Sequence, residues 1–320
     1  MDGRKNTDIC GGGAAAHDVY LYGMVVRTHA FLLGGNYPEP DSYNEIKQKF
    51  SYPGGETGMA ATVLASLGCK VKMDGNHQGY NTADIISGFY GGIGVDASPL
   101  LYDPEYEGLE DYIIIDRDTR TIFGQFAAYF NDYYQKGRAR WNTPSGGDIK
   151  AAKAAGIDPF FDKQSLLAAR LCREHGVPFV TIDEKPGSEI CRLASIIAVS
   201  GEYIRDHIPE YHGRKALLLQ KYAESTEALV ILTGGGDAAV YGRNGQAKEF
   251  SAYKVDTVST LGAGDTFKAG CVYALLNGYD DDETVSFASA CAAVACTRFP
   301  LHLNPPSLSE ISALRKAAGR

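Results

Sequence analysis

The pattern of apolar and polar positions along the chain predicts strands that alternate with helices. The first convincing apolar run covers residues 18–26, and its density of apolar residues indicates a buried parallel strand. Further along, a helix is expected over residues 164–175, followed by strands over 177–183 and 196–200 with a short helix between them. This alternation is typical of a parallel sheet with crossover helices. The pattern therefore predicts an α/β fold.

Three stretches differ from this alternation. Residues 27–52 are polar and rich in turn-forming residues. Residues 112–123 place a polar turn between two apolar arms, which predicts a β-hairpin. Residues 229–238 begin as a buried strand and run into a glycine turn, and a hairpin is expected directly after them.

The segment 258–267 carries the most chemical information. A strand-like lead-in runs into the small residues Gly262, Ala263 and Gly264, which let the backbone approach a ligand closely. The first amides of the helix that follows lack partners of their own and can hold an anion, and Asp265 stands where they point. This pairing suits phosphoryl transfer, because the amides stabilise the transferred charge while the acid takes a proton from the attacking hydroxyl. A tight turn whose Asp favours the helix dipole is the alternative.

Composition narrows the classes of function. The chain has 320 residues, of which 44% are hydrophobic and 22% charged, as expected for a globular protein with a sizeable core, although length alone also allows two domains. The net charge of −8 and the lack of a Lys/Arg cluster argue against a nucleic-acid surface. Seven cysteines without a C-x-x-C pair indicate neither a disulfide framework nor a zinc site. Because no apolar run is long enough to span a membrane and the N-terminus is polar, we expect a cytoplasmic protein.

The segment 260–267 resembles the C-terminal signature of the PfkB (ribokinase-like) family of sugar kinases. The resemblance implies that Asp265 is the catalytic base and that the amides of the preceding Gly-Ala-Gly turn form the anion hole. It implies a three-layer α/β sandwich around a mostly parallel sheet, with a small β lid. It also implies ATP and Mg²⁺ as cofactors, with a monovalent cation such as K⁺ as a further candidate.

The resemblance extends over about residues 18–305 in the family's order. It implies a single kinase domain over residues 17–310, with lid segments inserted near 27–52 and 110–132. Residues 1–16 and 311–320 are then expected to be tails. In the family such lid sheets often form the dimer contact, so a homodimer through the lid is also expected.

The acceptor side of the predicted site matches the family less well. Gly54 and Gly55 precede a predicted helix, where the family carries a Gly-Gly loop that lets substrate hydroxyls approach the backbone. By resemblance, Thr28, Glu56 and Met59 are further acceptor contacts. Many family members carry Asp and Asn in place of Thr28 and Met59, and both bind sugar hydroxyls. The two replacements change which hydroxyls of an acceptor the pocket can hydrogen-bond, so an acceptor other than ribose or fructose is compatible with the sequence.

The nucleotide side is predicted from a glycine turn and a helix of small residues. By resemblance, the family's nucleotide-binding Thr-x-Gly-x-x-Gly fits at Thr233 and Gly235, although Ala238 replaces the last glycine. Thr260 and Ala292 are the other predicted ATP contacts. Ala292 lies in an alanine-rich helix expected over residues 286–298, which borders the adenine pocket in the family.

Glu202 is the candidate acid for the magnesium site. It follows the predicted strand that ends at Ser200, and open α/β sheets place ligand sites at the carboxyl ends of their strands. The sequence around it resembles the Ser-x-acid variant of ketohexokinase-like members. A glutamate in the first turn of a helix, placed there for the helix dipole, is the alternative.

Together these features predict an ATP-dependent kinase that phosphorylates a hydroxyl, with the primary alcohol of a small sugar favoured, and without nucleic-acid or membrane partners. Neither a Walker motif nor the motifs of protein kinases are present. A nucleoside or polyol kinase of the same fold is the closest alternative, and a non-catalytic sugar-binding relative is another. An oxidoreductase rests only on glycines 11–13, which no strand precedes.

Overall fold

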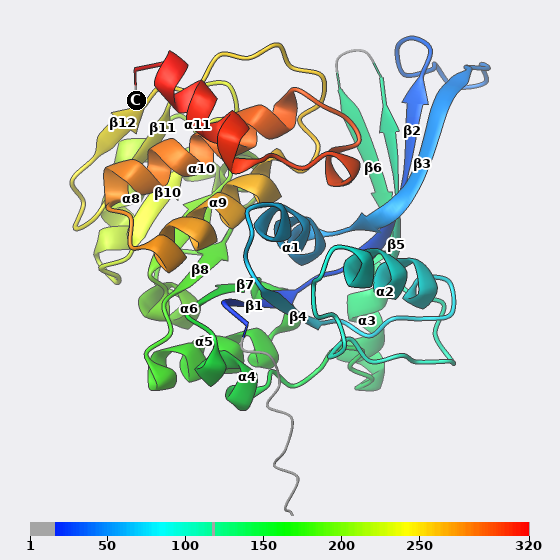
Figure 1. Ribbon diagram of the computed structural model, residues 1–320, viewed down its shortest axis with the longest axis horizontal. Helices are drawn as coiled ribbons and strands as arrows, with labels where there is room; N and C mark the ends of the chain where they lie inside the picture. The colour runs from blue at the N-terminus through cyan, green and yellow to red at the C-terminus, as the bar shows by residue number, and fades with distance from the viewer. Residues whose placement is uncertain (1–16, 117–118, 320) are drawn as a thin grey trace, which may run out of the picture.

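A mostly parallel eight-stranded sheet forms the centre of the molecule in the computed structural model, which describes residues 17–116 and 119–319 (Figure 1). The six neighbouring strands from β4 to β10 run in parallel, and β11 and β12 are antiparallel additions at one edge. The strand order is β12 (Lys248–Phe250), β11 (Ala239–Gly242), β10 (Leu229–Leu232), β9 (Ile196–Val199), β8 (Phe179–Ile182), β7 (Ala154–Ile157), β1 (Val19–Gly23) and β4 (Val71–Gly75).

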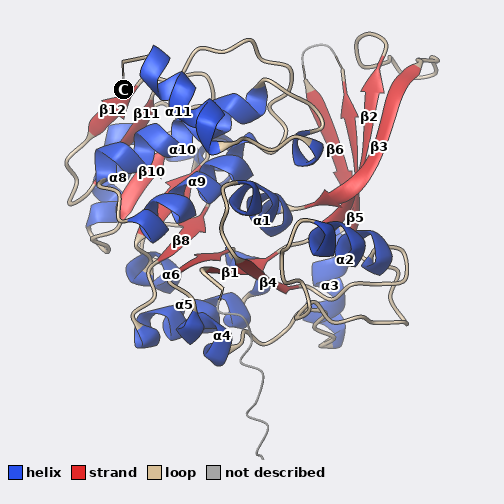
Figure 2. Cartoon of the chain, in the orientation of Figure 1, coloured by secondary structure: helices blue, strands red, loops and turns tan. Residues whose placement is uncertain are grey.

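Helices cover both faces of this sheet and make the predicted three layers (Figure 2). Because successive side chains of a strand point to opposite faces, β1 supplies Val19 and Leu21 to one core and Tyr20 and Tyr22 to the other. The first core is covered by α1 (Glu56–Ser66), α9 (Ala263–Asn277) and α10 (Asp281–Cys296), and the second by α5 (Lys163–His175) and α8 (Lys215–Ala223). The predicted α/β class with a mostly parallel sheet is confirmed.

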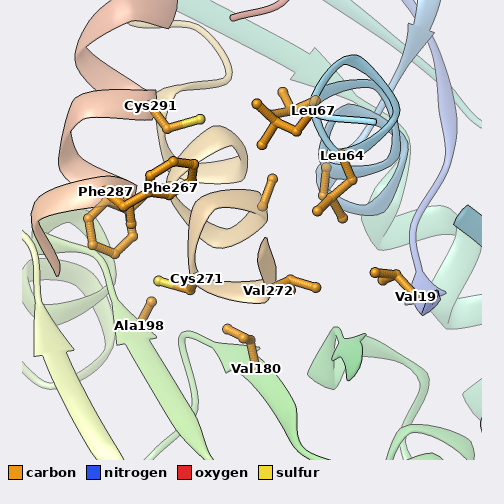
Figure 3. Packing of buried hydrophobic residues seen from close by; sticks show 14 of the residues in the cluster. Val19, Leu64, Leu67, Val180, Ala198, Phe267, Cys271, Val272, Phe287 and Cys291 are labelled. Atoms are coloured by element: carbon orange, nitrogen blue, oxygen red, sulfur yellow. The ribbon is translucent and has the colours of Figure 1, made fainter. Parts of the chain in front are cut away.

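Helix α9 is held firmly in the first core (Figure 3). Its residues Phe267, Cys271 and Val272 pack among apolar side chains of the sheet and of α1 and α10. A Cβ at Gly270 would lie 2.7 Å from the backbone Cα of Ala288, so only glycine allows α9 and α10 to pack this closely. The position of the α9 N-terminus is therefore fixed by the core.

A second sheet of four strands, in the order β3-β2-β5-β6, stands beside the main body (Figure 1). Its strands are β2 (Val26–Leu33), β3 (Ile46–Gly54), β5 (Glu110–Ile115) and β6 (Arg120–Gly124). The hairpin predicted over residues 112–123 is confirmed by the antiparallel pairing of β5 and β6. The polar stretch 27–52 contains most of β2 and β3, whose outer positions are exposed.

The single strand predicted over residues 18–26 is wrong, because the chain leaves the main sheet after Gly23 and enters the second sheet at Val26. The side chain of Asn76 makes this exit possible. It accepts a hydrogen bond from the Val25 amide at 2.7 Å and donates one to the Val25 carbonyl at 2.9 Å. An apolar sequence cannot reveal such a break, since both strands are buried on either side of it.

The predicted C-terminal tail, residues 311–320, is also wrong. Residues Leu308–Ala317 form helix α11, which begins with a capping box between Ser307 and Glu310. Ile311 is fully buried in the first core, which explains why this short segment is ordered against α10. The predicted N-terminal tail, residues 1–16, lies outside the described residues.

The remaining helices complete the layers and the connections. They are α2 (Ala83–Gly92), α3 (Phe126–Lys136), α4 (Gly146–Ala151), α6 (Glu189–Leu193) and α7 (Gly201–His207). Within residues 17–116 and 119–319, no helix combines the length and apolar character needed to cross a membrane. The six cysteines in these ranges are free.

Candidate active site

The N-terminus of α9 forms a turn that leaves backbone amides free. Gly262 has φ 77°, a left-handed conformation that favours glycine, and a Cβ there would lie 2.9 Å from the Leu301 side chain. The Ala263 amide donates to the Thr260 carbonyl, whereas the amides of Gly262, Gly264 and Asp265 have no acceptor among the described residues. Gly264 is exposed, and no atom lies within 4 Å of a Cβ built there. The turn is therefore open towards a ligand, and its amides can hold an anion.

Asp265 lies half-buried in the first turn of α9, and Glu56 faces it from the start of α1. Burial raises the pKa of Asp265 above its usual range, and the positive charge of Lys268 opposes this rise. Burial also raises the pKa of Glu56, and the negative charge of Asp265 raises it further. Lys268 and Arg120 lower the pKa of Asp265, whereas the negative charges of Asp265 and Asp158 raise the pKa of Glu56. The two acids therefore share one site, in which ionisation of one disfavours ionisation of the other.

A fully buried ion pair lies close to these two acids, and the sequence analysis did not predict it. The Nζ atom of Lys268 contacts Oδ1 of Asp158, and neither side chain has any exposed area. Asp158 follows β7, and its second carboxylate oxygen accepts a hydrogen bond of 2.6 Å from the Thr57 hydroxyl on α1. The only sequence signal was a lysine on an otherwise apolar helix face, one turn after Asp265.

A pocket opens beside the free amides of α9. All four predicted nucleotide contacts line it: Thr233 and Gly235 after β10, Thr260 before α9, and Ala292 on α10. Ala263 and Gly264 line the same pocket, so the structure brings the predicted nucleotide residues and the anion-binding turn together. Aromatic side chains form part of its wall: Phe250, Tyr253 and Phe267. The role of these residues in binding ATP stays a prediction.

The Gly-Gly loop lies where β3 passes into α1, and both glycines are required by close contacts. A Cβ at Gly54 would lie 2.1 Å from the Thr28 hydroxyl oxygen. Gly55 has φ 82°, and a Cβ there would lie 2.6 Å from the Met24 carbonyl oxygen. The loop therefore holds the backbone before Glu56 in close contact with Met24 and with Thr28 of β2.

Thr28 is buried on β2 opposite Asp111 of β5, and sequence reasoning missed the second residue. Burial raises the pKa of Asp111 to about 6, although the hydrogen bond from Thr28 opposes this rise. The Oδ1 atom of Asp111 is buried and finds no partner among the described residues. A carboxylate is thus present near the place where the family pattern has Asp and this chain has Thr28, but it comes from the neighbouring strand.

The structure gives Met59 a packing contact. Its side chain clusters with Ala295 and Leu301, and it lies 3.4 Å from a Cβ built at Gly262. Met59 therefore supports the turn before Asp265, and its contacts are with apolar groups where the family pattern has a hydroxyl-binding Asn.

Arg120, the first residue of β6, reaches from the second sheet to the nucleotide side. Its Nη1 atom donates to the Thr260 hydroxyl at 2.6 Å, and Nη2 lies 4.0 Å from a carboxylate oxygen of Glu202. Its charge also lowers the pKa of Asp265, although burial outweighs this effect. No short motif could reveal this contact, because 140 residues separate Arg120 from Thr260.

The acids available for Mg²⁺ lie at the carboxyl ends of β8 and β9. Glu202, in the first turn of α7, has a side chain that is 67% exposed. Asp183 is half-buried and accepts a hydrogen bond of 2.7 Å from the Ser200 amide. Within the described ranges, no group of three or more His, Cys, Asp or Glu side chains could hold a metal by itself. These residues fit a Mg²⁺ ion whose other ligands are phosphate oxygens and water.

Comparison with known proteins agrees with this geometry. Residues 18–306 match the pfkB family of carbohydrate kinases. The 5-dehydro-2-deoxygluconokinase of Shouchella clausii is 27% identical over 295 residues, which cover 84% of this chain and 88% of the relative. That of Bacillus velezensis is 22% identical over 283 residues, with coverages of 83% and 86%.

Solved structures share the fold. Arabidopsis thaliana ribokinase complexed with ribose and ATP has a TM-score of 0.77 at 16% identity, over 94% of this chain and 99% of that one. The nucleoside kinase of Methanocaldococcus jannaschii, an archaeal member of the ribokinase family, has a TM-score of 0.74 at 19% identity, over 96% and 100%. The family match shows that the chain belongs to the pfkB family of carbohydrate kinases and is an ATP-dependent carbohydrate kinase.

Proposed function

We propose that this kinase transfers the γ-phosphoryl group of ATP to a hydroxyl, a primary alcohol, of a small uncharged sugar. The observation that carries the proposal is the location of Asp265 in the same helix turn as the free amides, beside the pocket that Thr233 and Thr260 line. Asp265 accepts the proton of the attacking hydroxyl. The amides of Gly264 and Asp265 donate to the oxygens of the phosphoryl group as charge builds up on them.

Mg²⁺, when bound with ATP, neutralises the phosphate oxygens during transfer. Glu202 and Asp183 are the acids that would hold it, directly or through water. The requirement for a monovalent cation such as K⁺ stays a prediction from the family resemblance.

Arg120 adds a second positive charge from the opposite side of the site. Its guanidinium lies at the Thr260 hydroxyl, next to the pocket and the free amides, where a γ-phosphoryl group would be in reach. Since Arg120 belongs to the second sheet, we infer that this sheet acts as a lid that carries the arginine into the site. A closed lid would also exclude water, which competes with the sugar as an acceptor.

The charges around Asp265 favour an uncharged acceptor. Glu56, Asp158 and Asp183 face it as carboxyl groups, and the nearest lysine, Lys268, is already paired. Two relatives are named 5-dehydro-2-deoxygluconokinase, and a gluconate carries a carboxylate of its own. This gluconate is therefore the second candidate acceptor in the test. Of the two described cations that act on Asp265, Lys268 is buried, and Arg120 has an exposed side chain that could meet the carboxylate.

A coupled ADP-release assay over a panel of acceptors tests the proposal. The panel contains neutral sugars, polyols, nucleosides, sugar phosphates and 5-dehydro-2-deoxygluconate, with Asp265→Asn as the inactive reference. A neutral hexose or pentose is expected to give the largest kcat/KM. If only a nucleoside or a polyol is phosphorylated, the acceptor is of that class and the proposed sugar is rejected. If no acceptor of the panel supports ADP release, the protein is a non-catalytic sugar-binding relative.

A further inference from the structure

The buried ion pair below Asp265 has no task in the phosphoryl transfer described so far. Lys268 and Asp158 are both fully buried, and they contact each other through Nζ and Oδ1. Lys268 follows Asp265 by three residues on α9, so the two side chains lie on the same side of the helix. The positive charge of Lys268 is therefore next to the proposed base.

Packing alone does not require a charge at this position. Moving a lysine and a carboxylate out of water is costly, and apolar side chains of similar size would fill the same space without that cost. Apart from Thr266, which is polar but uncharged, the other buried positions of α9 are apolar, among them Ala269, Cys271 and Val272. Lys268 is an exception on this helix, and its charge needs another explanation.

The other charges around Asp265 supply that explanation. Three carboxyl groups and two cations face it from separate parts of the chain. They are Glu56 on α1, Asp158 after β7, Asp183 after β8, Arg120 on β6 and Lys268 on α9. Like charges disfavour the ionised form of a carboxylate, and a base must be ionised to accept a proton. Of the two cations, Lys268 belongs to the packed core, whereas Arg120 belongs to the second sheet.

Building on the phosphoryl transfer inferred above, we propose that the Asp158–Lys268 pair is a positioning device that holds a fixed positive charge below Asp265 and so keeps the base ionised among the neighbouring acids. The hydrogen bond from Thr57 to Asp158 ties α1 to the same pair. The pair therefore also fixes the Gly-Gly loop, at the start of α1, relative to the phosphate-binding turn of α9.

The two partners act on Asp265 in opposite directions, which makes the proposal testable. Lys268 lowers the pKa of Asp265 and Asp158 raises it, while burial is the largest influence. Removal of the lysine charge should therefore raise this pKa, and removal of the aspartate charge should lower it. A pair that only holds the fold together would not produce opposite shifts.

The experiment is an NMR titration of the Asp265 carboxyl carbon in protein labelled with ¹³C at aspartate. The resonance is identified by its loss in Asp265→Asn, and the readout needs neither an acceptor nor turnover. In Lys268→Met the pKa of Asp265 is expected to rise by about one unit, since a nearby opposite charge shifts a carboxyl pKa by at least that much. In Asp158→Asn it is expected to fall. The acid limb of kcat/KM should move in the same two directions.

Lys72→Met is the matched control, because it removes a lysine from another ion pair, 2.8 Å from Asp148, and should leave the Asp265 titration unchanged. If Lys268→Met does not fold, the double variant Lys268→Met/Asp158→Asn replaces it. Because this variant removes one charge of each sign, the pKa of Asp265 is expected to rise less than the one unit expected for Lys268→Met. An unchanged pKa of Asp265, or shifts in one direction for both single variants, overturns the proposal. If the pKa of Asp265 shifts in opposite directions in the two variants but no acceptor is phosphorylated, the proposed role of the ion pair is supported and the proposed phosphoryl transfer is rejected.

Discussion

The two sides of the active site are built in different ways. On the phosphoryl side, the free amides and Asp265 come from one continuous stretch, residues 262–265, at the start of a single helix. On the proposed acceptor side, Thr28 and Asp111 come from two strands of the second sheet, β2 and β5. The first side is a local backbone conformation, and the second is an assembly of distant side chains.

This difference fits the ligand group that each side is proposed to bind. A phosphate can be held by backbone amides, whose geometry depends on a glycine turn and a helix start and hardly on the other side chains. Sugar hydroxyls are distinguished by side chains, and a buried group left without its partner costs binding energy. A turn that binds phosphate can therefore stay the same while the side chains that bind an acceptor change with the substrate.

Among the substitutions that test this difference between the two sides, replacement of the proposed base should have the largest effect on catalysis. In Asp265→Asn, kcat is expected to fall by about 10²- to 10⁴-fold, because the acceptor hydroxyl loses its proton acceptor. Binding of ATP, measured by calorimetry, should change little, since the amides remain. Asp84→Asn is the control, because Asp84 is an exposed acid in the first turn of α2. Near-normal turnover of Asp265→Asn would place the base elsewhere.

Removal of the lid arginine tests whether the second sheet takes part in the chemistry. In Arg120→Met, kcat is expected to fall by about 10²-fold, as when one donor to a developing negative charge is lost. The control is Arg138→Met, which breaks an exposed ion pair with Glu105. A change in the acceptor KM alone, with kcat preserved, would confine the second sheet to acceptor binding.

Substitutions on the acceptor side should change the acceptor KM more than they change kcat. In Asp111→Asn the acceptor KM is expected to rise by about tenfold, which corresponds to the loss of one hydrogen bond to a charged group. Steady-state kinetics with the best acceptor of the panel measures this, and Asp103→Asn is the control from a connecting loop. A fall in kcat at constant KM would instead link Asp111 to phosphoryl transfer.

The smallest effect on catalysis is expected from the outer face of the second sheet. Phe123 on β6 is 48% exposed, its cross-strand partner Tyr112 on β5 is 40% exposed on the same face, and β6 is an edge strand. A homodimer through this sheet would cover them. In Phe123→Asp the dimer is expected to dissociate while kcat changes by less than about twofold, and light scattering measures the mass. A monomeric wild-type chain would reject the predicted dimer.

Sequence patterns predicted the elements that local signals define. The glycine turn before α9, the hairpin of β5 and β6, and the alternation from α5 to β9 could all be read from neighbouring residues. The break between β1 and β2 could not, because it depends on a hydrogen-bonding side chain, Asn76, from another part of the chain. Helix α11 was missed because it is short, and only the burial of Ile311 against the core makes it stable.

By itself, the sequence determined that this protein has a glycine turn at the start of a helix with an acid on it, because a turn and a helix start are encoded by consecutive residues. Only the tertiary structure decided which charges surround that acid. Lys268 meets Asp158 across 110 residues, and Arg120 meets Thr260 across 140. Such meetings depend on strand order and on register, where a shift of one residue turns a side chain to the opposite face.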